Sequence, residues 1–140
     1  MRSVINTLGL SNVVVIEAEL EKFAHSLIAN KSAKQSLLVP QAGFNLITFR
    51  AFRSFESDIV KGLFRLCSSK GIIAAYKGRL EKIEADIAML EKYAASSKKN
   101  SGASNDDSKF QYAGCEIIPC PTPLLAEVRH VLLIRGQKPA

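Results

Sequence analysis

The sequence has no tryptophan, only two histidines and three cysteines, and no unbroken apolar run long enough to cross a membrane. A membrane-spanning helix needs about 20 predominantly apolar residues, so we expect no membrane span. An odd and sparse set of cysteines does not provide the disulfide framework of a small secreted domain. The N-terminal residues also lack the apolar stretch and cleavage site of a signal peptide. These absences favour an intracellular protein.

Groups of chemically active side chains are also missing. We find no nucleophile, base and orienting group together, and the glycines match no phosphate-binding loop. Cys115 and Cys120 lack the two further ligands that a zinc site needs. Paired acids such as Glu84 and Asp86 fall on a helix face that we expect to be exposed. The sequence therefore predicts no catalytic residue, no metal site, no cofactor and no enzyme activity.

What the chain does have is positive charge. Its 140 residues are 47% hydrophobic, enough for one small domain with an aliphatic core, and they carry a net charge of +6 with a pI near 9.4. A basic balance favours a nucleic acid or an acidic surface as the partner.

Two segments show the apolar spacing of helices that pack lengthwise on other helices. Apolar residues recur at spacings of 3, 4, 3 and 4 in both. In the first segment they are Val13, Ile16, Leu20, Phe23 and Leu27, and in the second Leu80, Ile83, Ile87, Leu90 and Ala94. We predict helices that end near Asn30 and Ala95.

A third and central helix is predicted from Asn45 to Ser69. The connection before it, residues 31–44, contains Pro40 and Gly43, which interrupt a helical pattern. A connection this short favours an antiparallel hairpin of the helix that ends near Asn30 and the central helix. One side of the central helix carries Phe52, Phe55, Ile59, Leu63 and Leu66. Gly62 lies beside this apolar stripe and is interpreted as a point of close contact. Gly71 ends the helix, and a short apolar turn or helix follows.

The other side of the central helix is basic and rich in hydroxyl groups. From Arg50 to Arg79 there are seven basic and two acidic residues, so most of the net charge is concentrated there. Serine hydroxyls can donate to phosphate oxygens and ribose hydroxyls. From Arg50 to Arg65 the stripe would extend about 22 Å at 1.5 Å per residue, which fits tracking along a nucleic-acid backbone. The candidate RNA-binding residues are Arg50, Arg53, Ser54, Ser57, Lys61, Arg65, Ser68, Lys70 and Lys77.

The last third of the chain has a different character. Residues 96–109 have no periodicity and little to bury, which predicts a flexible linker. Three prolines interrupt the tail from Phe110 to Ala140, in which residues 128–134 could form a strand or the end of a helix. We thus divide the chain into a helical domain (1–95), a linker (96–109) and an irregular tail (110–140).

The stretch DIVKGLFRLCSSKGIIAAYKGR, Asp58 to Arg79, resembles the insect nodavirus "B two" proteins, which are small helical suppressors of RNA silencing. In that family a basic position leads into an apolar run, a helix break and a turn. The resemblance implies an all-α homodimer, a four-helix bundle whose long second helices lie along double-stranded RNA. It places Lys61 at the key basic position of the family and Arg53 within one residue of another.

The leading hypothesis is accordingly a viral, cytoplasmic protein of the host cell that shields double-stranded RNA from host silencing proteins without reading its sequence. A helical protein-interaction module is the alternative, in which the basic face is only solvated surface. Attachment to anionic membrane surfaces is a third, weaker alternative, which would need an apolar stripe exposed beside the arginines.

Overall fold

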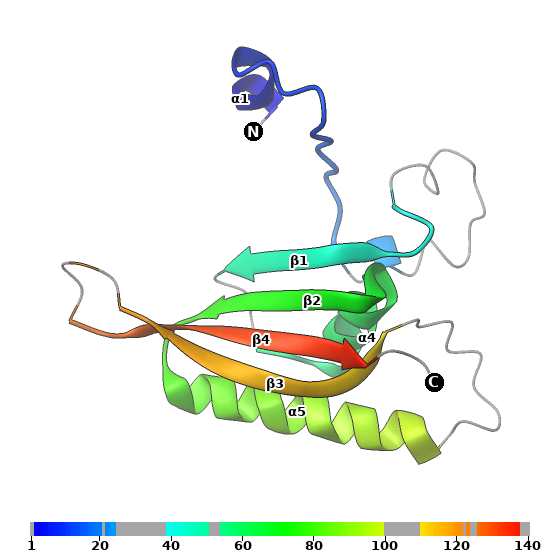
Figure 1. Cartoon of the computed structure of the whole chain (residues 1–140), viewed down its shortest axis with the longest axis vertical. Helices are drawn as coiled ribbons and strands as arrows, with labels where there is room; N and C mark the ends of the chain where they lie inside the picture. The colour runs from blue at the N-terminus through cyan, green and yellow to red at the C-terminus, as the bar shows by residue number, and fades with distance from the viewer. Residues whose placement is uncertain are drawn as a thin grey trace.

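The computed structural model describes residues 2–20, 22–24, 39–50, 54–99, 110–121, 123 and 126–137. In chain order its elements are α1 (Arg2–Thr7), β1 (Phe44–Arg50), α4 (Ser57–Leu66), β2 (Cys67–Lys77), α5 (Leu80–Lys99), β3 (Gln111–Cys120) and β4 (Arg129–Gln137). The fold is mixed α/β (Figure 1). The prediction of an all-α protein that pairs into a four-helix-bundle dimer is therefore wrong.

The four strands form one sheet in the order β1-β2-β4-β3. Strands β1 and β2 run parallel and are joined through α4, whereas β4 is antiparallel to both β2 and β3. Parallel neighbours need such a crossover because a tight turn can only reverse the chain. As a result β1 and β2 end on the same side of the sheet, where β4 begins. We call this row of strand ends the carboxyl edge; it is distinct from the two edge strands, β1 and β3.

Among the described residues of the predicted central helix, only those of α4 are helical. Residues Phe44–Arg50 form β1, and their aromatic and β-branched side chains are typical of strands. At the other end, Cys67 already has an extended backbone (φ −83°, ψ 140°), so β2 follows α4 directly. The helix between them buries Ile59, Leu63 and Leu66, as the apolar stripe predicts.

Of the other two predicted helices, one is confirmed and one is partly wrong. The helix near residues 80–95 is confirmed by α5, whose last residues extend into the predicted linker. The first predicted helix is wrong over residues 13–19, which have no regular structure; residues 20 and 22–24 are helical, and 25–38 lie outside the described residues. The prediction of an irregular tail is also wrong, because the tail contains β3 and β4, with Pro119 in a strand at the sheet edge. Of the two alternatives for residues 128–134, the structure has the strand, in β4. The division at residues 95 and 109 stays a prediction.

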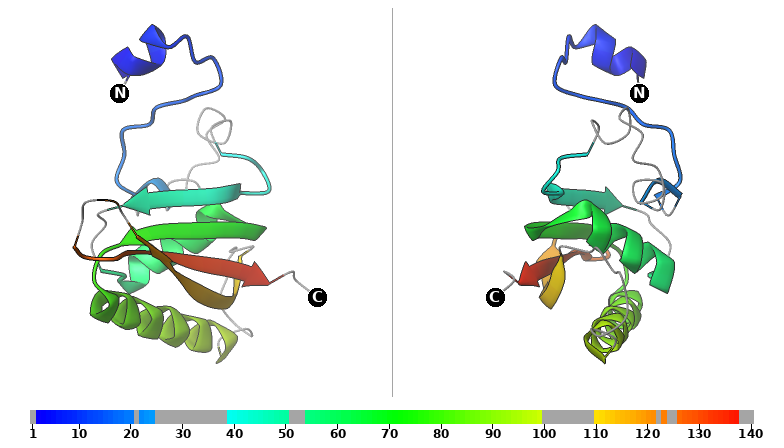
Figure 2. Two further views of the ribbon diagram at one scale, coloured as in Figure 1. Left: turned by 60° about the vertical axis from the view of Figure 1, so that its left-hand side comes forward. Right: turned by 90° about the vertical axis from the view of Figure 1, so that its right-hand side faces the viewer.

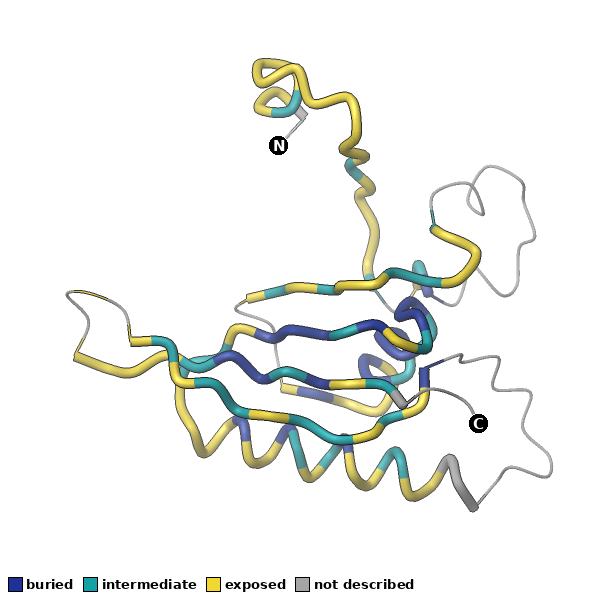
Figure 3. Tube along the Cα trace, in the orientation of Figure 1, coloured by how far each residue is buried: buried dark blue, intermediate teal, exposed yellow. Residues whose placement is uncertain are grey.

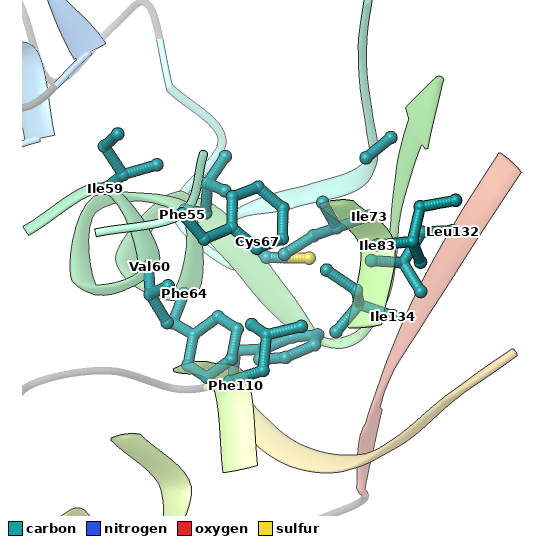
Figure 4. Close-up of a cluster of buried hydrophobic side chains, with 13 residues drawn as sticks. Phe55, Ile59, Val60, Phe64, Cys67, Ile73, Ile83, Phe110, Leu132 and Ile134 are labelled. Carbon is teal, nitrogen blue, oxygen red and sulfur yellow. The ribbon is translucent and has the colours of Figure 1, made fainter. Parts of the chain in front are cut away.

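The core lies between the sheet and its two longer helices (Figures 2 and 3). Side chains of α4 and α5 pack against Ile73 of β2 and against Leu132 and Ile134 of β4, and all three strand residues are fully buried. Phe64 joins the helices to the start of β3, since its ring lies 4.7 Å from that of Phe110 and 5.7 Å from that of Tyr93. Figure 4 shows how Phe64 and Phe110 converge with Ile73, Leu132 and Ile134.

No helix within the described ranges is long and apolar enough to cross a membrane. This agrees with the expectation from the sequence.

Candidate functional site at the carboxyl edge

Three exposed arginines lie along the carboxyl edge of the sheet. Arg50 is the last residue of β1, Arg79 follows β2 by two residues, and Arg129 is the first residue of β4. Arg50 pairs in register with Tyr76, whose side chain is also exposed. In open α/β sheets, ligands bind outside the carboxyl ends of the parallel strands. We call Arg50, Arg79 and Arg129 the carboxyl-edge arginines and take them as the centre of the candidate site.

The turn after β2 is tied to the start of β4. His130 Nδ1 donates a hydrogen bond to the carbonyl oxygen of Gly78 at 3.1 Å. A Cβ atom at Gly78 would lie 2.8 Å from Nη1 of Arg129, so the guanidinium occupies the space that a larger residue would fill. Gly78 thus allows Arg129 to lie against the turn that carries Arg79. The start of β4 is thus kept against the turn after β2.

A buried ion pair supports the same edge from the helix side. Lys77 Nζ lies 2.7 Å from Oδ2 of Asp86, and the two side chains are 8% and 2% exposed. Asp86 Oδ1 also accepts a hydrogen bond of 2.7 Å from the backbone N–H of Phe55, and Lys77 Nζ lies 4.4 Å from the centre of the Phe55 ring. A carboxylate satisfied by a cation and an amide can remain charged inside a protein. One side chain of α5 therefore anchors both the end of β2 and the start of the segment that leads into α4.

The expectation that Asp86 is exposed is wrong. It lies three residues after Ile83 and four before Leu90, and all three residues are buried on the same side of α5. The 3, 4 spacing through residue 86 was thus a readable signal of burial. What the spacing did not reveal was the partner, since Lys77 ends a strand whose later residues were predicted to form a short turn or helix.

The predicted RNA-binding residues do not form a single stripe. Arg50 and Lys77 lie at the carboxyl edge, but Lys77 is engaged by Asp86. Ser57 is exposed at the first position of α4, and exposed Ser54 precedes it. Lys61 and Arg65 are half-buried on α4, Lys70 is exposed in β2, and Arg53 lies outside the described residues.

Ser68 is placed least favourably for binding RNA. It is buried near the start of β2, at the opposite edge of the sheet, and its hydroxyl donates to Oδ1 of Asn45 at 3.2 Å. Sequence reasoning also missed Arg129, because residues 128–134 were left open between a strand and the end of a helix and were given no role. Register in the sheet brings Arg129 beside the end of β2, through the pairing of His130 with Lys77.

The three cysteines are free thiols. Burial raises the pKa of Cys67 to about 11, although a hydrogen bond with the backbone of Ser68 acts in the opposite direction. Such a thiol is protonated and a poor nucleophile at neutral pH. Across the described part of the chain, no group of three or more His, Cys, Asp or Glu residues is arranged to hold a metal ion.

No protein-family model matches the chain, but two curated proteins are similar to it. The ribosomal RNA small subunit methyltransferase G of Treponema denticola is 31% identical over 85 residues, which are 61% of this chain and 27% of that protein. The protein of the same name from Borrelia turicatae is 27% identical over 112 residues, which are 80% of this chain and 45% of that protein. The chain thus spans less than half the length of the relatives it matches.

Among solved structures, a crystal structure of a mutant of MtNAS is similar over 97% of this chain and 39% of that chain. The sequence identity is 16% and the TM-score 0.44.

These relatives overturn three predictions. The resemblance to the nodavirus proteins is wrong, because the similar curated proteins are methyltransferases and the fold contains a sheet. The predicted function, suppression of RNA silencing by a small viral protein, is wrong for the same reason. The prediction of no enzyme activity is contradicted as well, because both similar curated proteins are named as ribosomal RNA methyltransferases.

Proposed function

We propose that this chain forms part of an enzyme that methylates RNA of the small ribosomal subunit, and that the carboxyl-edge arginines hold the RNA backbone. The observation that carries the proposal is the similarity to two small-subunit ribosomal RNA methyltransferases, over 61% and 80% of the chain. The position of the arginines supports it, because they occupy the edge where sheets of this kind bind their ligands.

Exposed arginines suit a phosphate backbone. A guanidinium presents a planar fork of donors that matches two phosphate oxygens, and it stays charged at any physiological pH. Three such groups on neighbouring strand ends, about 5 Å apart from one strand to the next, can grip successive points of a folded RNA. Lys77 is not included, because its charge is engaged by Asp86.

A methyl transfer also needs a methyl donor. The carbonyl oxygen of Gly78 accepts a hydrogen bond from His130, and Arg129 fills the space beside the Cα of Gly78. These contacts assign no place to the donor. We assign to the described residues a role in holding RNA and derive no chemical step from them.

The test measures binding of the full chain to a small-subunit ribosomal RNA transcript by filter retention. Arg50→Gln with Arg129→Gln should weaken binding about tenfold or more at low salt, since each lost phosphate contact removes a charge-assisted hydrogen bond. The matched control is Lys82→Gln with Lys92→Gln, which removes the same charge from exposed positions of α5 and should change binding little.

A third variant separates this proposal from binding by the original candidate residues. Lys61→Gln with Lys70→Gln again removes two charges, but from α4 and from β2. We expect a loss close to that of the α5 control. Equal losses in all three variants would show a general charge effect and would contradict the assigned site, as would an undiminished affinity of the arginine variant.

A further inference from the structure

Tyr76 is an aromatic residue that the core does not use. It lies one residue before the end of β2 and is 54% exposed. The other aromatic residues that the structure describes are buried or half-buried. A single exposed apolar side chain is normal on a protein surface, so the groups that surround Tyr76 decide whether it has a role.

Arg50 lies beside Tyr76 on the same face of the sheet. Successive side chains of a strand point to opposite faces. In β1, Phe49 packs against the core, so Arg50 points away from it. In β2, Ala75 belongs to the core and Lys77 is paired with a carboxylate of α5, so Tyr76 also points away from the helices. Arg50 and Tyr76 are partners in register, and they share the face that is turned toward the viewer in Figure 1, where the strands lie in front of α4.

Strand β4 places a second arginine on this face. Leu132 belongs to the core, so alternation along β4 directs Arg129 to the same face as Tyr76. Nη1 of Arg129 lies 2.8 Å from the position that a Cβ atom would take at Gly78, two residues after Tyr76. Tyr76 therefore has Arg50 beside it on β1 and Arg129 beside it on β4. Both arginines are exposed.

We propose that Tyr76 is a stacking platform for an unpaired base of the RNA, and that Arg50 and Arg129 hold the phosphates on either side of that base. This proposal rests on the proposed function and adds a contact with a base to the contacts with the backbone. Every base has a flat face that stacks on an aromatic ring, and proteins commonly hold single-stranded RNA in this way.

The two arginines favour RNA over an apolar protein surface as the occupant of this face. Covering two guanidinium groups with apolar side chains would remove them from water without a partner, which is costly. Phosphates on either side of a stacked base supply these partners. Because the bases of a duplex already stack on one another, the platform accepts single-stranded RNA and not a duplex.

The experiment uses the absence of tryptophan from the chain. Tyr76→Trp places the only indole of the protein on the platform, and indole fluorescence falls when a base stacks on the ring. A single-stranded oligoribonucleotide from small-subunit ribosomal RNA should lower the fluorescence by about half or more at saturation. An abasic oligonucleotide of the same length should bind through its phosphates and change the fluorescence little. The matched control is Leu80→Trp, which places the indole at an exposed position of α5 and should respond to neither.

A second measurement asks whether the ring contributes to affinity. Tyr76→Leu should weaken filter retention of the single-stranded oligonucleotide about tenfold, since it removes the stacking surface. Tyr76→Phe keeps the ring and should retain the affinity of the wild type. Because Tyr76 is mostly exposed, both variants should unfold in urea at the midpoint of the wild type, which separates loss of the ring from loss of the fold.

The outcomes distinguish this proposal from the proposed function. RNA that the wild type retains, but that neither lowers the indole fluorescence nor binds Tyr76→Leu more weakly, would overturn the platform alone. RNA that the wild type does not retain would overturn both. An equal response to a duplex of the same sequence would exclude stacking of an unpaired base. An equal response to free adenosine would assign the platform to a small nucleoside ligand, and would also overturn the proposal.

Discussion

Asp86 of α5 holds the ammonium group of Lys77 with one carboxylate oxygen and the backbone amide of Phe55 with the other, each at 2.7 Å. The carboxylate thereby links the end of β2 to the segment that enters α4. Both are elements that position the carboxyl edge, so the stability of this link bears directly on the candidate site.

Breaking this ion pair on one side should be costly. Asp86→Asn keeps an acceptor for the Phe55 amide but leaves Lys77 buried without a counter-charge, which typically costs about 3–5 kcal/mol. Adding Lys77→Met should restore a large part of the loss, because no unpaired charge then remains. Urea unfolding of the two single variants and the double variant gives the coupling energy.

The exposed ion pair of Arg135 and Glu116 serves as the comparison for the buried pair. Nη2 of Arg135 lies 3.3 Å from Oε2 of Glu116, and the two side chains are 51% and 57% exposed. Glu116→Gln should cost less than about 1 kcal/mol, as exposed pairs do. Equal costs for Asp86→Asn and Glu116→Gln would show that the buried pair does not stabilise the edge as described.

Two glycines should respond to alanine in opposite ways. At Gly71 a Cβ atom would lie 2.4 Å from Sγ of Cys67 and 2.8 Å from the carbonyl oxygen of Phe44. The backbone would have to shift, so we expect Gly71→Ala to destabilise the protein by about 1–3 kcal/mol.

At Gly62 the nearest atom to a new Cβ would be that of Ala24, at an ordinary 3.5 Å. The predicted close contact therefore exists but leaves room for a methyl group. Since Gly62 lies inside α4, Gly62→Ala should stabilise the fold by up to about 1 kcal/mol through helix propensity. Thermal unfolding compares the two variants, and shifts of the same sign would contradict these contacts.

Stability should fall in alkaline solution because of Cys67. The pKa of an ordinary thiol is 9.0, and the pKa of Cys67 in the folded chain is about 11. As pH rises above 9, the unfolded chain releases the thiol proton first, so the stability that is complete below pH 9 is lost between pH 9 and 11. The loss from this group is about 2–3 kcal/mol, from 1.36 kcal/mol per pKa unit.

The ionisation of Tyr112 should also lower the stability of the folded chain above pH 10, because burial raises its pKa as well. Urea unfolding at pH 8 and pH 11 isolates Cys67 if Cys67→Ala is measured alongside, since that variant should lose less stability over this range. A parallel fall in the wild type and in Cys67→Ala would assign the effect to other groups.

The salt dependence of RNA binding should report the number of phosphate contacts. For the full chain, the logarithm of the affinity should fall linearly with the logarithm of the salt concentration. Arg50→Gln with Arg129→Gln should reduce this slope by about two, or one per contact. Lys82→Gln with Lys92→Gln should keep the slope of the wild type, and a slope that the arginine variant does not change would remove both residues from the interface.

The helix α5 and the buried side of α4 could be predicted from the sequence alone. The spacing of Ile83, Ile87 and Leu90 determined α5, and the apolar residues after Phe55 correctly marked the buried side of α4. Both results follow from the 3.6-residue repeat, which a segment carries regardless of its neighbours.

Only the tertiary structure decided that Phe44–Arg50 and Cys67–Lys77 are strands. Their side chains also suit a helix, and the choice depends on hydrogen bonds with segments far away in the chain, which no local pattern encodes. The same holds for the carboxyl edge. Arg50, Arg79 and Arg129 are brought to one edge by strand pairing. The partners of Asp86 come from β2 and from the segment before α4, as Lys77 and the backbone of Phe55, which the spacing along α5 does not encode.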